Sequence, residues 1–366
     1  MKKKALILLL LTAALFVTGC AAPNANGSVQ TPPFTTMPVP ETNQPSASPP
    51  AAGELVSDYF PVLENVRLTY EGVGNEYASY VSDTEFAQGN KVQRRIDNGG
   101  TVSSRVFKWE NGRLTRVLSV PEAYVRMNYL SAPEAEADAE ILLQEPLAAG
   151  TAWDVPAGRR TITGTDVSVS TPSGSYRALE VTTQGTDSKT IDYYAKGAGL
   201  VKSVFQSGDM VIESSLARIE KDEPFLQVVR LYYPGQDGTG RYYREVQLAM
   251  ATNMALDAAV AEAYMVEPKG NVGRVFTPGT RILSLSRSED NVILLDLNQA
   301  FITERTGSKA YEEGVLHCVA DTFGNLLLSD KVLLTVEGKP YASSQVTLQE
   351  GEILTVDQTQ AQIIID

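Results

Sequence analysis

The chain has 366 residues and a formal net charge of −13, from 31 Lys and Arg against 44 Asp and Glu, with one His and two Cys. These counts exclude a zinc site built from several Cys or His and a disulfide framework. The acidic balance excludes a nucleic-acid partner, because phosphate binding needs clustered basic residues. The length predicts two or three domains.

The N-terminus has the pattern of an export signal. Three lysines at positions 2–4 precede an apolar run over residues 5–17, which is shorter than the ~20 residues that a membrane-spanning helix needs. The run ends in Val17-Thr18-Gly19-Cys20, which resembles the lipobox of bacterial lipoproteins. The resemblance implies that residues 1–19 are a signal peptide and that Cys20 carries lipid on the extracytoplasmic face of the cell membrane. The alternative is an ordinary secretory signal with an incidental Cys.

Residues 20–52 are predicted to be a disordered tether. Eight of the 19 prolines lie between residues 21 and 52, and no apolar run there is long enough to form a core. The folded part is expected to begin near Gly53.

Residues 53–222 are predicted to form an antiparallel β-rich domain, either a curved sheet or an open barrel. Apolar and polar residues alternate in short runs, as at Val66, Leu68 and Tyr70. Turn signals separate the runs at intervals of roughly ten residues, and Asn111-Gly112 is a strong hairpin signal.

Aromatic residues of this domain are candidates for lining a groove that binds lipid or cell-wall glycan. The interpretation that we favour is that they fill cross-strand core positions. The segment around Tyr193-Tyr194 and Gly197-Ala198-Gly199 resembles β-rich modules of bacterial surface lipoproteins, a resemblance that implies no activity. The candidate aromatic residues are Tyr70, Tyr77, Tyr80, Trp109 and Trp153.

Residues 223–348 are predicted to be a small α+β domain with the order βαββαβ, followed by a C-terminal tail over residues 349–366. Helices are expected over residues 245–266 and 308–323, because apolar residues recur there at steps of three and four. Strands are expected over residues 226–233, 281–287, 292–297 and 331–337. The two helices should cover one face of a single small sheet.

This second domain resembles the GerM domain of sporulation and spore-germination lipoproteins. The matching segments are 229–234, 278–283, 292–297 and 332–339. The resemblance implies a noncatalytic scaffold of the cell envelope, with envelope proteins as partners in a ring-like assembly, in sporulation or germination. It implies no cofactor.

The sequence offers little for catalysis. His317 and Cys318 are adjacent on a predicted helix, so their side chains point about 100° apart and do not form a nucleophile–base pair. Asp296 is a candidate functional carboxylate, with a structural role at a strand end as the alternative. Calcium could bind near Asp237 or Glu289-Asp290, although no EF-hand spacing is present.

We therefore predict a noncatalytic scaffold or protein-interaction lipoprotein with no catalytic residue, cofactor or metal site. The alternative function is binding of lipid or cell-wall glycan by the β-rich domain. A deep apolar pocket within residues 55–219 would favour this alternative, and a filled interior would count against it. Cell-wall hydrolysis by two carboxylates is a third possibility.

Overall fold

The structure is a computed structural model that describes residues 53–364. The predicted signal peptide, Cys20 and the tether lie outside the described residues and stay predictions. No helix within residues 53–364 is long and apolar enough to cross a membrane.

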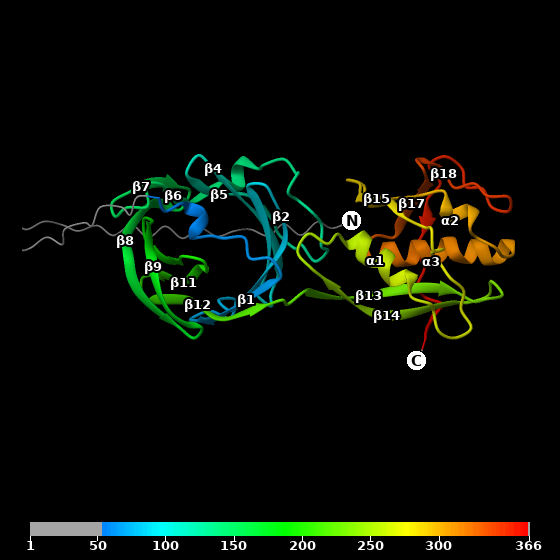
Figure 1. The fold of residues 1–366 in the computed structure, drawn as a ribbon, viewed down its shortest axis with the longest axis horizontal. Coiled ribbons are helices and arrows are strands. Elements are labelled where there is room, and N and C mark those ends of the chain that lie inside the picture. The colour runs from blue at the N-terminus through cyan, green and yellow to red at the C-terminus, as the bar shows by residue number, and fades with distance from the viewer. Residues whose placement is uncertain (1–52, 365–366) are drawn as a thin grey trace, which may run out of the picture. The chain divides into compact units, whose positions relative to one another are not determined.

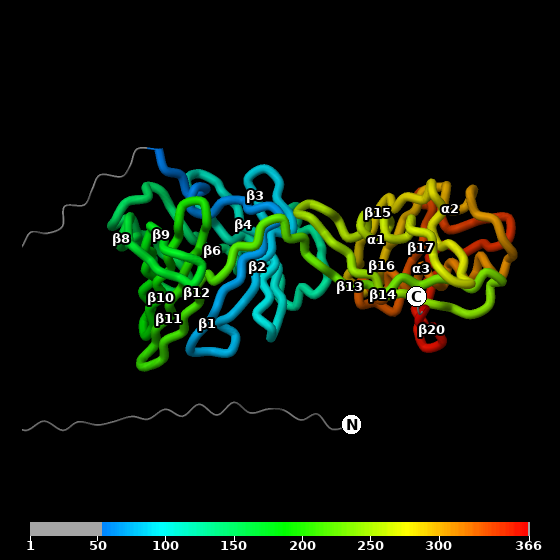
Figure 2. Tube along the Cα trace, turned by 60° about the horizontal axis from the view of Figure 1, so that its bottom comes forward, coloured from blue at the N-terminus to red at the C-terminus, as the bar shows by residue number. Residues whose placement is uncertain are grey.

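Twelve strands of the first domain form one antiparallel sheet (Figure 1). The sheet consists of two six-stranded meanders, β1–β6 and β7–β12, which are joined where β1 pairs with β12 (Figure 2). Two short 3-10 helices, η1 (Val56–Asp58) and η2 (Glu136–Asp138), flank the strands. The strands are β1 (Val66–Val73), β2 (Tyr80–Gln88), β3 (Lys91–Asp97), β4 (Val102–Glu110), β5 (Arg113–Val120), β6 (Glu140–Gln144), β7 (Ala152–Val155), β8 (Gly158–Thr171), β9 (Gly174–Gln184), β10 (Lys189–Ala195), β11 (Gly199–Ser207) and β12 (Met210–Lys221).

The hairpin between β4 and β5 shows how the sequence sets this topology. Asn111 and Gly112 form its two-residue turn with φ values of 51° and 69°. A turn with two positive φ angles matches the right-handed twist of the flanking strands, and Asn-Gly adopts it at low cost. The hairpin predicted from Asn111-Gly112 is confirmed.

The sheet closes on itself almost completely, and side chains join its two edges. Strands β6 and β7 are the edges of the sheet and have no backbone ladder between them. The Trp153 Nε1 group donates to the Ile141 carbonyl at 3.0 Å, and Arg160 Nη1 donates to the same oxygen at 2.7 Å. Arg160 Nη2 also pairs with Glu140 Oε1 at 2.6 Å, while its Nε donates to Thr183 Oγ1 at 2.8 Å. We call this line of contacts between the two edges the seam.

Arg160→Met should destabilise the first domain. Arg160 is 5% exposed, and its loss leaves the partly buried Glu140 without its closest partner. Breaking a buried ion pair from one side costs about 3 kcal/mol, which urea unfolding of the full chain would measure. Arg159→Met is the matched control, because the Arg159–Asp154 pair is exposed and should change stability by less than about 0.5 kcal/mol. Equal stability of the two variants would show that the seam does not depend on Arg160.

The second domain contains two small sheets. Strands β13, β14 and β20 form the first sheet, and β15, β16, β17 and β18 form the second, in which β19 also pairs with β17. The elements are β13 (Phe225–Pro234), β14 (Arg241–Met250), α1 (Leu256–Met265), β15 (Ile282–Arg287), β16 (Val292–Leu297), α2 (Ala300–Thr303), α3 (Lys309–Leu327), β17 (Lys331–Val336), β18 (Lys339–Pro340), β19 (Leu354–Thr355) and β20 (Ala361–Ile363).

Helix α3 lies between the two sheets and packs against β13 on one side and β16 and β17 on the other (Figure 1). The Ser308 hydroxyl caps its first turn by accepting from the Tyr311 amide at 3.2 Å. Val315, Cys318 and Phe323 are each 0% exposed although they point in different directions around the helix. The prediction of two helices on one face of a single sheet is therefore wrong, because the central helix is covered on both sides.

The predicted helix over residues 245–266 is also wrong in its first part. Residues 241–250 form strand β14, and α1 begins only at Leu256. Val246, Leu248 and Met250 alternate with exposed residues, which is the two-residue period of a strand with one buried face. The predicted βαββαβ order therefore omits strand β14. Residues 354–355 and 361–363, predicted as part of a tail, form β19 and β20 within the two sheets.

A buried charge network ties the end of the chain to this domain. Arg241 donates to Asp321 Oδ2 at 2.8 Å and to Asp357 Oδ2 at 3.2 Å, and the Asp357 amide donates to Asp321 Oδ1 at 2.8 Å. Asp321 is 0% exposed, and its burial raises the pKa of the carboxyl to about 6 in spite of the neighbouring Arg241.

The free energy of unfolding should fall as the pH rises from about 4 to above 6. A carboxyl whose pKa is raised by folding favours the folded state only while it is protonated, so this contribution is lost as the pH passes the folded pKa. A shift from 3.8 to about 6 corresponds to roughly 3 kcal/mol. Urea unfolding at several pH values would measure this slope, and Asp321→Asn should flatten it, whereas Asp290→Asn at an exposed turn should not. A slope that persists in Asp321→Asn contradicts the assignment.

Candidate functional site

The twelve-stranded sheet encloses a cavity of about 470 Å³. Every strand of the sheet except β7 contributes side chains to its lining. Sheets with more than eight strands enclose space that their own side chains do not fill, and the volume lies within the range of small-molecule pockets. Tyr77 and Ala157 are lining residues that are also exposed, so they mark where the cavity opens to solvent. A deep apolar pocket within residues 55–219 was the predicted mark of ligand binding. A pocket is present there, but its lining is partly polar and charged, which the prediction did not include.

Strand alternation positions the lining. Residues two apart on one strand point to the same face, so Arg94 and Ile96 of β3 and Arg105 and Phe107 of β4 both face inward. The lining combines aromatic and aliphatic side chains, hydroxyl groups, four arginines and two carboxylates. The arginines are Arg94, Arg105, Arg116 and Arg160, and the carboxylates are Glu140 and Asp192.

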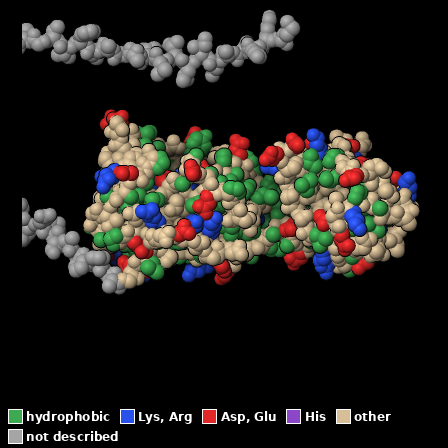
Figure 3. Space-filling model, turned by 90° about the horizontal axis from the view of Figure 1, so that it is seen from above, with side chains coloured by type: hydrophobic (Ala, Val, Ile, Leu, Met, Phe, Trp, Pro, Cys, Tyr) green, Lys and Arg blue, Asp and Glu red, His purple; other side chains and the backbone are tan. Residues whose placement is uncertain are grey.

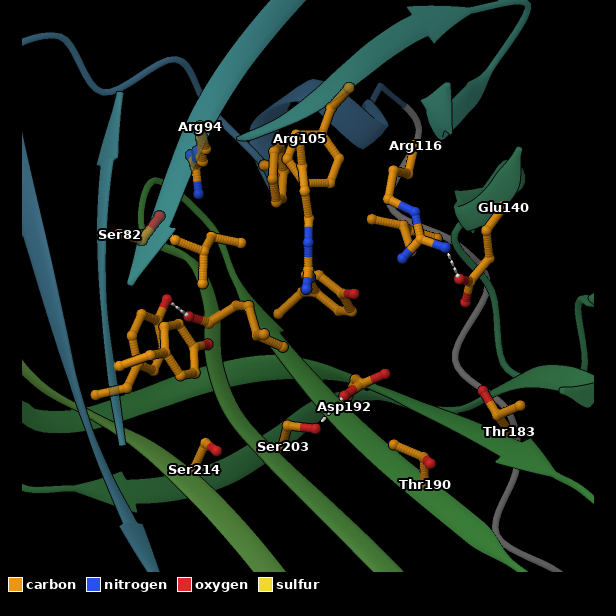
Figure 4. A pocket seen from close by; sticks show the side chains of 18 of the residues that line it. Ser82, Arg94, Arg105, Arg116, Glu140, Thr183, Thr190, Asp192, Ser203 and Ser214 are labelled. Carbon is orange, nitrogen blue, oxygen red and sulfur yellow. Dashed lines mark hydrogen bonds and ion pairs between the residues drawn. The ribbon is translucent and has the colours of Figure 1, made fainter. Parts of the chain in front are cut away.

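Two of the arginines share one carboxylate. Arg116 Nη2 lies 2.9 Å from Glu140 Oε2 (Figure 4). Arg160 Nη2 lies 2.6 Å from Glu140 Oε1. Glu140 is therefore engaged at both oxygens by guanidinium groups.

The other two arginines have no carboxylate partner. Arg94 and Arg105 lie directly opposite each other on the paired strands β3 and β4. Arg94 is 5% exposed, donates from Nη2 to the Pro61 carbonyl at 2.9 Å and stacks 4.1 Å from the Phe60 ring centroid. The Nε groups of Arg94 and Arg105 are both buried without a hydrogen-bond partner. Burial lowers the pKa of both guanidinium groups, and the charge of Arg116 lowers that of Arg105 further.

Asp192 and two tyrosines complete the polar part of the lining. The Ser203 hydroxyl donates to Asp192 Oδ1 at 2.6 Å, and burial raises the pKa of this carboxyl (Figure 4). Tyr70 and Tyr80 stack with their ring centroids 4.3 Å apart, and the Tyr70 hydroxyl donates to the Leu200 carbonyl at 2.6 Å. Burial raises the pKa of Tyr70 to about 12. Both tyrosines are therefore neutral at ordinary pH and present flat ring faces.

The structure brings together three of the five predicted aromatic residues. Tyr70, Tyr77 and Tyr80 line the cavity, as the groove interpretation requires. Trp153 is buried at the seam, and Trp109 lies 6.2 Å from the Phe60 ring and outside the lining, as the core interpretation requires. The sequence analysis missed the arginines. The sequence signal for these arginines is an Arg at an inward-facing position of a β strand, where an apolar residue is ordinarily found.

His317 and Cys318 do not form a site. His317 is exposed, whereas Cys318 is 0% exposed and burial raises the pKa of its thiol far above the usual value. Burial also lowers the pKa of His317. The prediction that the two side chains point apart is confirmed.

The predicted candidate carboxylates of the second domain have structural partners. Asp296 Oδ1 accepts from Thr335 Oγ1 at 2.6 Å and from the Gly338 amide at 2.8 Å, so it fixes the turn that follows β17. Asp237 Oδ1 accepts from the amide and the hydroxyl of Thr239. Glu289 and Asp290 lie in the exposed turn between β15 and β16. Within residues 53–364 no group of three or more His, Cys, Asp or Glu could hold a metal ion.

Charges of both signs are distributed over the surface. On the face in Figure 3, Lys and Arg side chains are interspersed with Asp and Glu side chains, and no broad basic area is visible. This face therefore lacks the basic stripe that nucleic-acid binding requires.

The fold and the cavity thus define a protein with a ligand-sized site in its β-rich domain and a separate α+β domain. Residues 230–342 match the Germane family, which is described as sporulation and spore germination. This match confirms the resemblance of the second domain to GerM. Comparison with curated proteins gave no match.

Three solved structures show distant similarity. The tandem GerMN domains of the sporulation protein GerM from Bacillus subtilis are 19% identical, with a TM-score of 0.29, and the match covers 37% of this chain and 48% of that one. An exported protein with a YmcC-like fold from Bacteroides fragilis is 15% identical, with 44% and 98% covered and a TM-score of 0.26. A lipoprotein from Parabacteroides distasonis is 14% identical, with 44% and 98% covered and a TM-score of 0.27. The chain therefore spans about half the length of the tandem-domain structure.

Proposed function

We propose that this protein is a noncatalytic, lipid-anchored protein of the bacterial cell envelope that binds a small ligand inside its twelve-stranded sheet. The open cavity of about 470 Å³ carries this proposal. A protein that needed the sheet only as a scaffold would gain stability by filling this space, because unfilled volume costs packing energy. The sequence from Val17 to Cys20 supports the anchored, extracytoplasmic location.

The arrangement of the cavity favours binding over hydrolysis. A glycosidase needs one carboxyl group that gives up a proton and a second that acts as base or nucleophile. Both oxygens of Glu140 are engaged by guanidinium groups, so neither is free to contact a substrate oxygen. The remaining carboxylate, Asp192, accepts a hydrogen bond from Ser203.

Filling the cavity should abolish ligand binding. Thr190 lines the cavity, so Thr190→Trp places an indole ring in it. We expect the full chain to bind the neutral apolar dye N-phenyl-1-naphthylamine with increased dye fluorescence, and Thr190→Trp to weaken this binding at least tenfold. Thr182→Trp is the matched control, because Thr182 lies on the neighbouring strand β9 and is not a lining residue. Equal dye affinity in the two variants would place binding elsewhere and refute the proposed site.

A second candidate function is assembly with other envelope proteins through the Germane domain. The family is described as sporulation and spore germination, and these are the processes in which we place this assembly. Strand β13 is an edge of its sheet and carries Leu226 and Val228, which are 42% and 60% exposed. An edge strand with exposed apolar residues is suited to pairing with a strand of a partner or of a second copy.

Val228→Lys should reduce crosslinking of the full chain to its envelope partners, because a charge on an edge strand opposes strand addition. Crosslinking in intact cells followed by purification would measure the change. Val211→Lys is the control, because Val211 is 48% exposed on β12 of the first domain. Unchanged crosslinking of Val228→Lys would exclude this edge as the contact.

A further inference from the structure

We infer that the ligand of the cavity carries an anionic carboxylate or phosphate group, which the guanidinium groups of Arg105 and Arg94 bind. This inference rests on the proposed function, because it assigns a ligand class to the same cavity. Nothing in the Germane match specifies it, since residues 230–342 lie outside the twelve-stranded sheet.

The placement of Arg94 and Arg105 is the first observation. The two residues are direct cross-strand partners and both face the cavity. The like charge of Arg116 acts on Arg105, in surroundings that water screens only partly. A bound anion beside the Arg105 guanidinium group would offset this like charge.

The unsatisfied donors are the second observation. Arg94 is 5% exposed, yet its Nε group has no partner, and Arg105 Nε is also buried without one. Within residues 53–364, the Arg105 side chain has neither a hydrogen bond nor an ion pair. Buried polar groups are nearly always satisfied, and guanidinium forks match the geometry of carboxylate and phosphate oxygens. Figure 4 shows Arg105 extending from β4 into the cavity, where a ligand can meet it.

The charge balance of the lining is the third observation. Both oxygens of Glu140 are taken by Arg116 and Arg160. Asp192 accepts from Ser203 and forms no ion pair among the described residues. Four guanidinium groups therefore face two carboxylates, and neither carboxylate forms an ion pair with Arg94 or Arg105 among the described residues. One anionic group would leave the cavity closer to neutral.

The rest of the lining admits two sources of such an anion. Phe60, Phe107 and Leu200 suit the apolar body of an acyl-chain acid, whereas Ser82, Ser214 and other hydroxyl groups suit an acidic sugar. The shared chemistry is the anionic group, so the experiment separates the sources.

The test compares two dyes that differ only in charge. Anilinonaphthalene-8-sulfonate has the ring system of N-phenyl-1-naphthylamine plus one sulfonate group, which stands in for the anionic group of the ligand. With the full chain, Arg105→Gln should weaken binding of the sulfonate dye tenfold or more, since hydrogen bonds to charged groups are the strong ones, and should leave the neutral dye within twofold. Arg113→Gln, an exposed arginine of the adjacent strand β5, is the control and should change neither affinity. Equal effects of Arg105→Gln on both dyes would overturn the inference.

Displacement of the sulfonate dye from the unmodified protein tests the inference independently of whether any variant folds. Decanoate should displace the sulfonate dye at concentrations at least tenfold lower than 1-decanol if the source is an acyl acid. Glucuronate should displace the sulfonate dye at concentrations at least tenfold lower than glucose if the source is an acidic sugar. If neither acid competes better than its neutral counterpart, the inference is overturned. The proposed function still stands in that case if the neutral dye binds and Thr190→Trp weakens its binding. If neither dye is sensitive to Thr190→Trp, the proposed function fails and the inference fails with it.

Discussion

The contacts of Arg160 across the seam are the interaction on which the first domain depends. A sheet whose edges meet without a backbone ladder leaves carbonyl groups that need other donors, and Arg160 and Trp153 supply them to the Ile141 carbonyl. Closure by side chains makes the interior a pocket enclosed by strands instead of an open sheet face. It also brings Glu140 into the lining, where it pairs with Arg116 and Arg160 and leaves Arg94 and Arg105 without a carboxylate partner.

Most elements of the fold could be predicted from the sequence because they depend on local patterns. The Asn111-Gly112 hairpin and the strand over residues 292–297 follow from turn chemistry and apolar runs, and both are present as predicted. The error at residues 245–250 arose because Val246, Met250 and Met254 fit a helical step as well as a strand step over a short window. The division into two sheets could not be predicted, because β19 and β20 are only two or three residues long and form by pairing with distant segments.

The site was less predictable than the fold. Aromatic residues indicated a groove, and Tyr70, Tyr77 and Tyr80 do line the cavity. The arginines gave no motif, since Arg105 and Arg160 come from strands that only closure of the sheet brings to one interior. Which face of a strand is inward is set by register, and register in a sheet of twelve strands is a property of the whole domain. Asp296 was predicted as a candidate functional carboxylate but does not belong to the site. Its carboxylate accepts hydrogen bonds from Thr335 and from the Gly338 amide, so its role is structural.

The β1–β12 pairing has a consequence for how the chain folds. Each meander contains only pairs of strands that are neighbours in the sequence, so each can form from local contacts. β1 (residues 66–73) joins β12 (residues 210–221), and this is the one non-local strand pair in the twelve-stranded sheet. During synthesis from the N-terminus, one edge of β1 must therefore wait until almost the whole domain has been made. A chain that emerges slowly exposes this unpaired edge for the longest time, which makes β1 the strand of this domain most in need of protection by folding factors.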